Sequence, residues 1–468
     1  MAKLFGTDGV RGVAGVYPME PEFALKFGKA AGVLVCQNAK KVAICRDTRA
    51  SGQMLEAAMT AGFNVVGVDV VSLGVLPTPS MTGQIHELGV DMGVIITASH
   101  NKASDNGIKI IKNDGNRFEK ETLEELEGLV VGDEVCTPYQ NYNSEQSLGS
   151  SSSPAGGEVS FGQLEFDDNG AKRYVERIMN ILPSEGALKG LRVVVDCANG
   201  AMHDVLPMVY KNYGAGVITL GNTPDGYNIN KDCGSQHSEN LIKAVVEAKA
   251  DLGIAVDGDG DRIVMCDEKG NLIDCDQFAA FLGKMFKEQG KLKGNAVVTT
   301  VVSNLGLAKY LKSIGIDYYA SWVGEPSIIA KMREIGANVG GEESGHMILL
   351  DHGKSGDALA VSLMVAYNVL KSGKRMSEIF PLFELMPKKR TDVTFAKKEN
   401  MQIAVDDAEV KKVIEDCRAE MGDRGQILVR PSGTEPKVQV WVWGEDPAEA
   451  EAVNKKIVEV ITKFAVVG

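Results

Sequence analysis

The sequence predicts a large α/β protein with three similar mixed α/β domains, whose sheets are largely parallel, and a smaller C-terminal α+β domain. Three observations support this fold class. The chain has 468 residues, which is too many for a single hydrophobic core. An order of strand, helix, strand, helix, strand and polar loop occurs three times, and strands that alternate with helices form parallel sheets through right-handed crossovers. The last segment breaks this order with two strands that lie between helices.

The first round of this order ends at a strand that runs into a serine. Its expected elements are helix 21–36, strand 41–45, a helix from the polar loop 46–52 to about residue 62, strand 64–71, helix 80–88 and strand 93–96. The last strand, Gly93-Val94-Ile95-Ile96, is short and rich in β-branched residues, which is typical of a buried strand. Ser99 follows shortly after its end.

The second and third rounds and the C-terminal segment complete the expected elements. The second round predicts strand 192–196, helix 200–213, strand 217–220, helix 240–250 and strand 252–256. The third predicts strand 296–300, helix 305–314, strand 317–320, helix 326–335 and strand 337–339. The C-terminal segment predicts helix 406–421, strands 426–430 and 437–443, and helix 447–464.

These elements suggest the domain limits. We expect a first α/β domain over 1–135, a Ser/Gly-rich insertion or linker over 136–165, a second α/β domain over 166–256, a third over 257–387 and the α+β domain over 388–468. The insertion contains Ser150-Ser151-Ser152-Ser153-Pro154, which is small, polar and without hydrophobic periodicity. The polar stretch Lys388–Asn400 is expected to be a connection into the last domain.

Composition limits the classes of partner. The formal net charge is −13, so a broad basic surface for nucleic acid or an anionic membrane is not expected. An anionic small substrate needs only a locally basic pocket and remains possible. The N-terminus has no apolar signal core, and no apolar run is long enough to span a bilayer. The eight cysteines are scattered without a Cys-x-x-Cys pair, which is typical of reduced core residues in a cytoplasmic protein.

Ser99 is a candidate nucleophile because of its place after a buried strand. Ligands of open α/β sheets bind outside the carboxyl ends of the strands. A hydroxyl residue after a strand also often forms only a turn, so this stretch alone leaves both readings open.

The loop Asp257-Gly258-Asp259-Gly260-Asp261-Arg262 is the strongest chemical signal. Carboxylates at alternate positions, separated by glycines, can point at one hard cation such as Mg²⁺. An EF-hand calcium loop is a poor match, because its sixth position should be Gly but is Arg262 and because strands are predicted on both sides. A solvated acidic turn is also disfavoured, since crowded carboxylates repel one another unless a positive charge is near.

Two further loops supply groups for a phosphorylated sugar. Arg430-Pro431-Ser432-Gly433-Thr434-Glu435-Pro436 combines a guanidinium, hydroxyls and a Gly-exposed amide, which suits a phosphate dianion but also an ordinary hairpin loop. Glu342-Glu343-Ser344-Gly345-His346 offers donors and acceptors for sugar hydroxyls, with His346 as a ligand contact. Lys109 is either a partner of the acidic loop, a proton carrier or a surface lysine, and Arg11 lies in a Gly-rich loop that suits an anionic site or a plain turn.

Taken together, these motifs resemble a known family. Thr97-Ala98-Ser99-His100-Asn101, the Asp257–Arg262 loop, Gly341-Glu342-Glu343-Ser344-Gly345-His346 and the Arg430–Pro436 loop occur in the order found in the α-D-phosphohexomutases. The resemblance covers essentially the whole chain. The opening Leu4-Phe5-Gly6-Thr7-Asp8-Gly9-Val10-Arg11-Gly12 is most similar to the amino-sugar branch of that family.

The resemblance implies an isomerase that moves a phosphoryl group between two positions of a phosphorylated hexosamine through a 1,6-bisphosphate, feeding amino-sugar nucleotide and cell-wall precursor synthesis. It implies a phosphoserine at Ser99, further catalytic residues at Lys109, Arg11, His100 and Arg262, and Mg²⁺ held by Ser99, Asp257, Asp259 and Asp261. It implies substrate contacts at Glu342, Ser344, His346, Arg430, Ser432, Gly433 and Thr434. It also implies domains around one central cleft, and a cytoplasmic monomer or homodimer.

Departures from the family pattern leave the sugar open. Glu343 stands where the amino-sugar branch usually has Gln, and a carboxylate there suits either the substrate's ammonium group or a different sugar. Val323-Gly324-Glu325-Pro326 replaces a more basic loop. A phosphomannomutase or phosphoglucomutase activity on the same scaffold is the close alternative, and a Mg²⁺-dependent sugar phosphatase is the more distant one.

Overall fold

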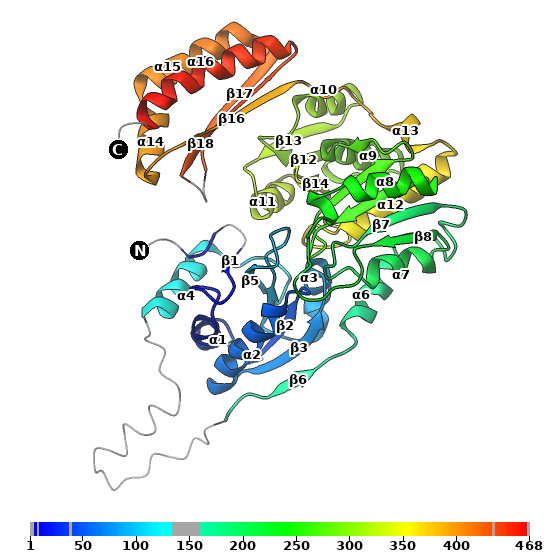
Figure 1. Cartoon of the computed structure of the whole chain (residues 1–468), viewed down its shortest axis with the longest axis vertical. Helices are drawn as coiled ribbons and strands as arrows, with labels where there is room; N and C mark the ends of the chain where they lie inside the picture. The colour runs from blue at the N-terminus through cyan, green and yellow to red at the C-terminus, as the bar shows by residue number, and fades with distance from the viewer. Residues whose placement is uncertain (1–3, 7–8, 37–39, 133–159, 433–435, 466–468) are drawn as a thin grey trace. The chain divides into compact units, whose positions relative to one another are not determined.

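The computed structural model describes residues 4–6, 9–36, 40–132, 160–432 and 436–465 (Figure 1). The chain divides into two compact units. The first unit contains Met1–Cys275, Gly324–Ile329 and Ser344–Ile379, and the second contains Asp276–Val323, Ala330–Glu343 and Phe380–Gly468.

A six-stranded mixed sheet, with the strand order β1-β5-β4-β2-β3-β6, opens the first unit. Its strands are β1 (Val10–Val13), β2 (Lys41–Arg46), β3 (Asp69–Val75), β4 (Met92–Ile96), β5 (Asp105–Lys112) and β6 (Leu164–Phe166). β2 runs parallel to β3 and β4, and β3 to β6, whereas β5 is antiparallel to both β1 and β4. The loop of Ser99 therefore joins two paired strands, which fixes both of its ends.

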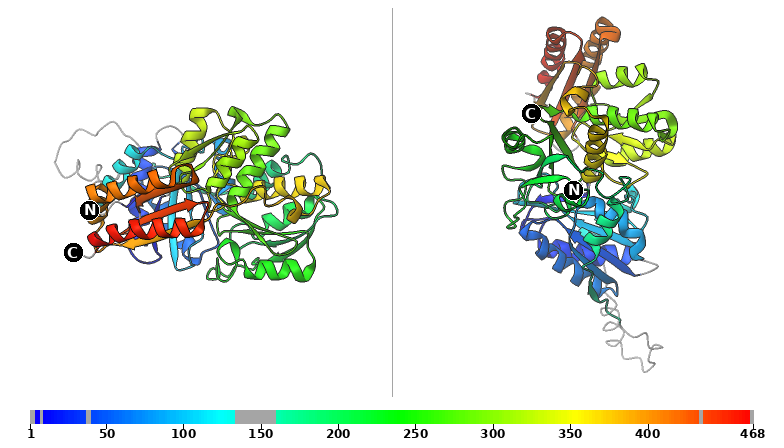
Figure 2. Two further views of the ribbon diagram at one scale, coloured as in Figure 1. Left: turned by 90° about the horizontal axis from the view of Figure 1, so that it is seen from above. Right: turned by 90° about the vertical axis from the view of Figure 1, so that its right-hand side faces the viewer.

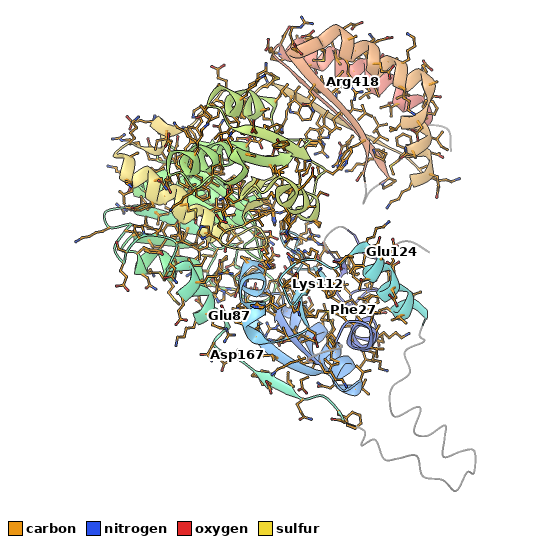
Figure 3. The ribbon with its side chains drawn as sticks, turned by 180° about the vertical axis from the view of Figure 1, so that it is seen from behind. Phe27, Glu87, Lys112, Glu124, Asp167 and Arg418 are labelled. Atoms are coloured by element: carbon orange, nitrogen blue, oxygen red, sulfur yellow. The ribbon has the colours of Figure 1, made fainter. Side chains whose placement is uncertain are left out.

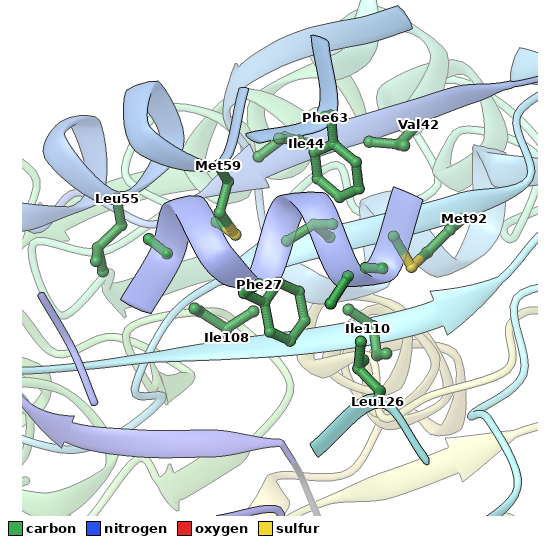
Figure 4. Close-up of a cluster of buried hydrophobic side chains, with 14 of the residues drawn as sticks. Phe27, Val42, Ile44, Leu55, Met59, Phe63, Met92, Ile108, Ile110 and Leu126 are labelled. Atoms are coloured by element: carbon green, nitrogen blue, oxygen red, sulfur yellow. The ribbon is translucent and has the colours of Figure 1, made fainter. Parts of the chain in front are cut away.

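Helices pack closely against this sheet. They are α1 (Pro21–Val35), α2 (Ala50–Val65), α3 (Thr78–Gln84), the 3₁₀ turn η1 (Ile85–Leu88) and α4 (Lys120–Gly132). Figure 4 shows Phe27 of α1 beside Ile108 and Ile110 of β5 and Leu126 of α4, all buried in one hydrophobic cluster. α1 and α2 approach closely, and a Cβ atom at Gly62 would come within 2.3 Å of the Leu25 carbonyl oxygen.

A second, five-stranded sheet has the order β11-β10-β9-β7-β8. Its strands are β7 (Arg192–Asp196), β8 (Gly216–Leu220), β9 (Leu252–Val256), β10 (Ile263–Asp267) and β11 (Leu272–Ile273). β7 is parallel to β8 and β9, and β10 is antiparallel to β9 and β11. The acidic loop joins β9 to β10, so both strands beside it belong to one sheet, although the sequence placed the loop at the start of the next domain.

Further elements complete the first unit. They are α6 (Gly170–Ile178), α7 (Val205–Asn212), the 3₁₀ turn η2 (Gly234–Gln236), α8 (Glu239–Ala248), β15 (Met347–Leu349), α12 (Ala358–Ser372) and α13 (Met376–Ile379). The side chain of Asp357 caps α12 by accepting from the Ala360 amide. Tyr174 of α6 donates a hydrogen bond to the same carboxylate over 2.9 Å, which ties α6 to the start of α12.

The α/β part of the second unit is centred on β12 (Ala296–Thr300), which pairs in parallel with β13 (Asp317–Ser321) and β14 (Val339–Gly341). The helical elements of this part of the chain are α9 (Cys275–Glu288), the 3₁₀ turn η3 (Lys293–Asn295), α10 (Leu305–Ser313) and α11 (Glu325–Ile335). β12 is buried along its whole length, as expected for a central parallel strand covered on both faces.

The C-terminal part of the second unit is an antiparallel sheet of order β16-β18-β17 with helices on one face (Figures 1 and 2). Its elements are β16 (Lys388–Thr394), α14 (Lys398–Asp406), α15 (Ala408–Met421), the 3₁₀ turn η4 (Gly422–Arg424), β17 (Gly425–Pro431), β18 (Lys437–Gly444) and α16 (Pro447–Ala465). Val438, Val440 and Val442 of β18 lie in the core beneath the helices. Arg418 of α15 (Figure 3) donates to the Ile427 carbonyl of β17 over 3.2 Å.

Several sequence predictions of single elements were wrong. The strand predicted from Asn64 begins at Asp69, because α2 continues to Val65 and Gly67 then turns with a φ of +79°. Most of the stretch predicted to connect the last two domains is β16, the edge strand of the C-terminal sheet, and α14. The helix predicted from residue 200 begins at Val205. The sequence analysis also missed β1, β5, β6, α4, α6, α9 and α12.

Candidate active site

Ser99 lies at the end of the buried strand β4, as predicted, and only 1% of it is exposed. Its backbone has a φ of +54°, a left-handed conformation that costs a non-glycine residue on the order of 1–3 kcal/mol. The Thr97 hydroxyl accepts a hydrogen bond from the Ser99 amide over 2.9 Å. Ser99 Oγ donates to Asp257 Oδ2 over 2.6 Å, so the serine hydroxyl points directly at the acidic loop.

The carboxylates of the acidic loop converge, as the sequence predicted. Asp257, Asp259 and Asp261 are buried, and each offers one oxygen within 4.8 Å of the others. A Cβ atom at Gly258 would come within 2.7 Å of the Ser99 carbonyl oxygen. Glycine at this position therefore lets the two loops approach each other.

The charges and unsatisfied oxygens of this cluster fit a metal ion. Burial, together with Asp261 and Asp259, raises the pKa of Asp257 well above its usual range. Burial alone would also raise the pKa of Asp261, but Lys109 and His346 hold it well below its usual range. Among the described residues, the buried Oδ1 atoms of Asp259 and Asp261 accept no hydrogen bond. A hard divalent cation with oxygen ligands would satisfy these atoms.

Lys109 of β5 belongs to this cluster and is not a surface lysine. Its Nζ atom lies 2.9 Å from Asp259 Oδ2 and 3.4 Å from Asp261 Oδ2, and only 1% of the residue is exposed. Thr78, at the start of α3, donates to Asp259 Oδ2 over 2.7 Å. The sequence analysis missed Thr78, although it follows a strand end in the same way as Ser99.

Basic residues also lie near Ser99. His100 Nδ1 lies 3.3 Å from Ser99 Oγ. Burial and the nearby guanidinium groups of Arg262 and Arg11 lower the pKa of His100 to about 4. The Arg262 amide donates to Asp257 Oδ1 over 3.1 Å. Arg11, on β1, pairs with Gly107 of β5. The serine therefore has both carboxylates and guanidinium groups in its neighbourhood, which suits transfer of a charged phosphoryl group.

His346 is buried behind the acidic loop. Its Nδ1 atom lies 3.6 Å from Asp261 Oδ1, and its Nε2 atom lies 2.8 Å from Glu325 Oε2. Burial alone would lower the pKa of His346, but the two carboxylates raise it well above its ordinary value. Arg117 completes the chain of charges, with Nε 3.0 Å from Glu325 Oε1. Glu325 comes from the loop that departs from the family pattern, and the sequence assigned it no role.

The predicted sugar and phosphate contacts fall in both units. Ser344 lies in the first unit, whereas Glu342, Arg430 and Ser432 lie in the second. Gly433 and Thr434 lie outside the described residues. Burial and the neighbouring Arg390 lower the pKa of Arg430. A crowded guanidinium of this kind gains stability when an anion binds beside it.

Glu343, the unusual residue of the sugar loop, is already paired. Its Oε2 atom lies 2.7 Å from Lys388 Nζ of β16, and both side chains are partly exposed. The carboxylate is therefore partly exposed on the second unit. It lies close enough to Arg430 to stabilise the charged guanidinium.

The fold and the site together define a class of enzyme. A buried serine at a strand end faces three carboxylates that could hold a metal ion, and the guanidinium groups of Arg262 and Arg11 act on the neighbouring His100. This arrangement serves phosphoryl transfer, in which a cation and basic groups neutralise the moving charge. Each cysteine in the described part of the chain is a free thiol, and no helix there is both long and apolar enough to cross a membrane.

Family comparisons make the assignment specific. The chain matches four models of phosphoglucomutase/phosphomannomutase: α/β/α domain I over residues 2–134, domain II over 172–270, domain III over 274–386 and the C-terminal domain over 391–460. The chain belongs to the phosphoglucomutase/phosphomannomutase family, and it is an intramolecular phosphotransferase of the isomerase class.

Curated relatives resemble the chain over nearly its full length. The phosphoglucosamine mutase of Paramagnetospirillum magneticum is 42% identical, with 99% of each chain covered. The phosphoglucosamine mutase of Rhizobium rhizogenes is 38% identical, with 98% of each chain covered.

Solved structures share the fold. A phosphoglucomutase/phosphomannomutase family protein from Burkholderia thailandensis has a TM-score of 0.79 at 22% identity, with 100% of this chain and 98% of that one covered. An N-acetylphosphoglucosamine mutase from Aspergillus fumigatus, solved with GlcNAc-6P and magnesium, has a TM-score of 0.67 at 16% identity, with 99% of this chain and 96% of that one covered.

Proposed function

We propose that this enzyme interconverts glucosamine 6-phosphate and glucosamine 1-phosphate through a phosphoserine at Ser99. The observation that carries the proposal is the buried hydroxyl of Ser99, 2.6 Å from Asp257 at the edge of the acidic cluster. The choice of the amino sugar is supported by the full-length relatives, which are phosphoglucosamine mutases.

The first transfer converts the 6-phosphate into a bisphosphate. The sugar O1 hydroxyl attacks the phosphorus on Ser99, so that the O1–P bond forms while the Oγ–P bond breaks. The proton of O1 leaves to a base, and Oγ takes a proton. We assign these proton movements to His100, whose Nδ1 lies 3.3 Å from Ser99 Oγ, and to Lys109, which binds the neighbouring acidic cluster.

The second transfer regenerates the phosphoserine. The 1,6-bisphosphate turns end for end without leaving. Ser99 Oγ gives its proton to a base and attacks the phosphorus on O6, so that the Oγ–P bond forms. The O6–P bond breaks and O6 takes a proton, which releases glucosamine 1-phosphate. Arg11 and Arg262 lie close enough to His100, the neighbour of Ser99, to lower its pKa. We assign them to stabilising the phosphoryl oxygens during both transfers.

We assign the metal to Mg²⁺. Asp257, Asp259, Asp261 and an oxygen of the Ser99 phosphate would hold it, and it would neutralise the charge of the transferring group. Lys109 keeps the Asp259 and Asp261 carboxylates together, so the ligands are arranged in advance.

The remaining polar loops are assigned to the substrate. Arg430 and Ser432, with Gly433 and Thr434, would bind the phosphate that is not being transferred. Glu342 and Ser344 would bind sugar hydroxyls in either orientation. The sequence suggested His346 as a substrate contact. Because it is buried between Asp261 and Glu325, we assign it instead to orienting Asp261. We place the reaction in the cytoplasm, where the free thiols stay reduced.

A serine substitution tests the mechanism. Ser99→Ala should accept no phosphoryl group, and its kcat should fall by at least about 1,000-fold, the scale of losing a covalent nucleophile. Ser104→Ala is the matched control, because Ser104 lies in the same loop and its hydroxyl donates to the adjacent Asp105 Oδ1 over 3.3 Å, away from the acidic loop in sequence. Near-full activity of Ser99→Ala would rule out the phosphoserine mechanism.

A substrate panel tests the sugar. The parent enzyme, with Mg²⁺ and the matching bisphosphate primer, should turn over glucosamine 6-phosphate faster than mannose 6-phosphate or glucose 6-phosphate. A preference for mannose or glucose would keep the mechanism and reject the amino sugar. Accumulation of free phosphate in place of an isomer would mean that water discharges Ser99.

A further inference from the structure

The strongest unexplained feature beside the site is a buried arginine at the start of α2. The side chain of Arg49 is fully buried. Its guanidinium donates to the carbonyl oxygens of Ser99 over 3.1 Å, of Asn101 over 2.8 Å and of Asp105 over 3.0 Å, and also to that of Lys102. One planar cation therefore binds the backbone of the whole loop between β4 and β5.

Arg49 is itself held in place. Its Nε atom donates to Asp47 Oδ2 over 2.9 Å, and its amide donates to Asp47 Oδ1 over 3.0 Å. The Thr97 hydroxyl donates to Asp47 Oδ2 over 2.6 Å. The same hydroxyl accepts a hydrogen bond from the Ser99 amide. A continuous set of hydrogen bonds therefore runs from Arg49 through Asp47 and Thr97 to Ser99.

A residue of the second sheet's domain binds the same loop from another side. Asn230 Nδ2 donates to the Ser99 carbonyl over 2.8 Å and to the Asn101 carbonyl over 3.0 Å. Asn230 is buried and lies outside the acidic loop. Two independent side chains therefore hold the same two carbonyl oxygens.

We propose that Arg49 and Asn230 are positioning residues for phosphoryl transfer: they fix the carbonyls of the Ser99 loop and so hold Ser99 in the left-handed conformation that aims Oγ at the acidic cluster. This rests on the proposed phosphoserine role of Ser99. Without these donors the strained φ of +54° relaxes, because left-handed residues persist only where surrounding contacts fix them. Misplacing a reacting group by about 1 Å costs about 100-fold in rate.

Arg49→Lys tests the arginine. Lysine keeps the charge beside Asp47 but has no planar fork, so it cannot bind all four carbonyls. We expect kcat to fall by about 100-fold with KM within about threefold of the parent. Amide hydrogen exchange in residues 97–107 should become faster, while the rest of the chain exchanges as in the parent. Arg46→Lys is the matched control, because Arg46 pairs with Glu56 over 2.8 Å and not with the Ser99 loop.

Asn230→Gly tests the same idea from the other domain and decides it if Arg49→Lys does not fold. Glycine tolerates the φ of +56° at this position. We expect about a 10-fold loss of kcat, unchanged KM and the same faster exchange in residues 97–107, since one of two supports is removed. Asn228→Gly is the control, because among the described residues its side chain bonds to the neighbouring 223–225 turn and not to the Ser99 loop.

The outcomes separate this inference from the proposed function. A folded Arg49→Lys or Asn230→Gly protein with kcat within twofold of the parent overturns the positioning role. So does a loss of kcat with unchanged exchange in residues 97–107. If the parent fails to turn over glucosamine 6-phosphate, the proposed function is wrong, yet the exchange experiment still decides whether the two residues hold the loop.

Discussion

The strained backbone of Ser99 shows how single residues shape this site. A serine in the left-handed region is unfavourable by itself, and its Oγ atom reaches Asp257 only because neighbouring groups fix the loop. Ser99, Lys109 and His346 each contact a carboxylate from another loop. The effect of a substitution on stability therefore depends on the buried charge of the partner that it leaves unpaired.

Lys109→Met should make the acidic cluster unstable when metal is absent. Removing one partner of a buried ion pair costs about 3–5 kcal/mol, and Lys109 faces both Asp259 and Asp261. Thermal unfolding in EDTA should therefore occur at a lower temperature than for the parent, and Mg²⁺ should recover part of the difference.

Lys112→Met is the matched control for this prediction. Lys112 lies on the same strand (Figure 3), but its ion pair with Glu119 is largely exposed, so its loss should cost at most about 1 kcal/mol. Equal unfolding temperatures of Lys109→Met and parent in EDTA would contradict the proposed role of Lys109.

His100 should make the free energy of unfolding depend on pH. Its pKa is about 4 when folded, below the ordinary value of 6.5. The unfolded state therefore binds a proton between these values, and the free energy of unfolding falls as pH falls from about 6.5 to about 4. Partial exposure limits the contribution to about 1–3 kcal/mol.

The comparison with His100→Gln isolates this contribution. The stability of the parent relative to His100→Gln, measured by urea unfolding, should decrease between pH 7 and pH 4.5. Phosphorylating Ser99 places negative charge beside His100 and should raise its pKa, which NMR titration of the imidazole would detect. A constant difference between the two proteins across this pH range would show that His100 is not buried in neutral form.

At the scale of single elements, the contact of α1 with α2 depends on glycines. Gly62→Ala would bring a Cβ atom within 2.3 Å of the Leu25 carbonyl, and overpacking of this kind costs about 1–3 kcal/mol. Gly128→Ala in α4 is the control, because nothing lies within 4 Å of its Cβ position. It should stabilise the protein by about 0.5–1 kcal/mol. The urea midpoints of unfolding measure the stability change of both variants. A Gly62→Ala protein more stable than the parent would contradict the close packing of α1 and α2.

The sequence predicts elements well where hydrophobic runs are short and bounded. β7, β9 and β12 have the predicted limits, because each is a buried apolar run between polar residues. β16 was missed because all of its residues except Val393 are polar or charged, a composition that an edge strand shares with exposed loops. The end of α2 at Val65 was not predicted, because the valines in and after the last turn of the helix favour a strand.

The candidate site could be predicted in part. Ser99 and the acidic loop were found because both follow buried strands, and the carboxyl ends of such strands collect ligand-binding groups. Arg49, Thr78 and Glu325 were not found, because their roles depend on partners far away in the chain. The position of Arg49 in a charged loop directly after a strand is the one sequence feature that could have indicated its role.

At the scale of the whole molecule, the proposed metal ligands all belong to the first unit. A ligand that binds only the folded state stabilises it by about 2.7 kcal/mol at 100 times its Kd. Adding Mg²⁺ should therefore slow amide exchange around residues 97–112 and 252–267 and leave β16–β18 unchanged.

Asp259→Asn is the control for the metal experiment, because it removes one proposed ligand and should abolish the protection. Equal protection of the C-terminal sheet would contradict a metal effect confined to the first unit. Protection by Mg²⁺ in Asp259→Asn equal to that in the parent would place the metal elsewhere.

The position of the acidic loop has a consequence for protein synthesis. The strands of the first sheet have all been translated once the ribosome passes Phe166, so Ser99 can take its place at the end of β4 early. Asp257, which accepts the hydrogen bond of Ser99 Oγ, emerges much later in the hairpin after β9. A nascent chain therefore carries the serine without its carboxylates, and the nucleophile gains its chemistry only when the second sheet has folded against it.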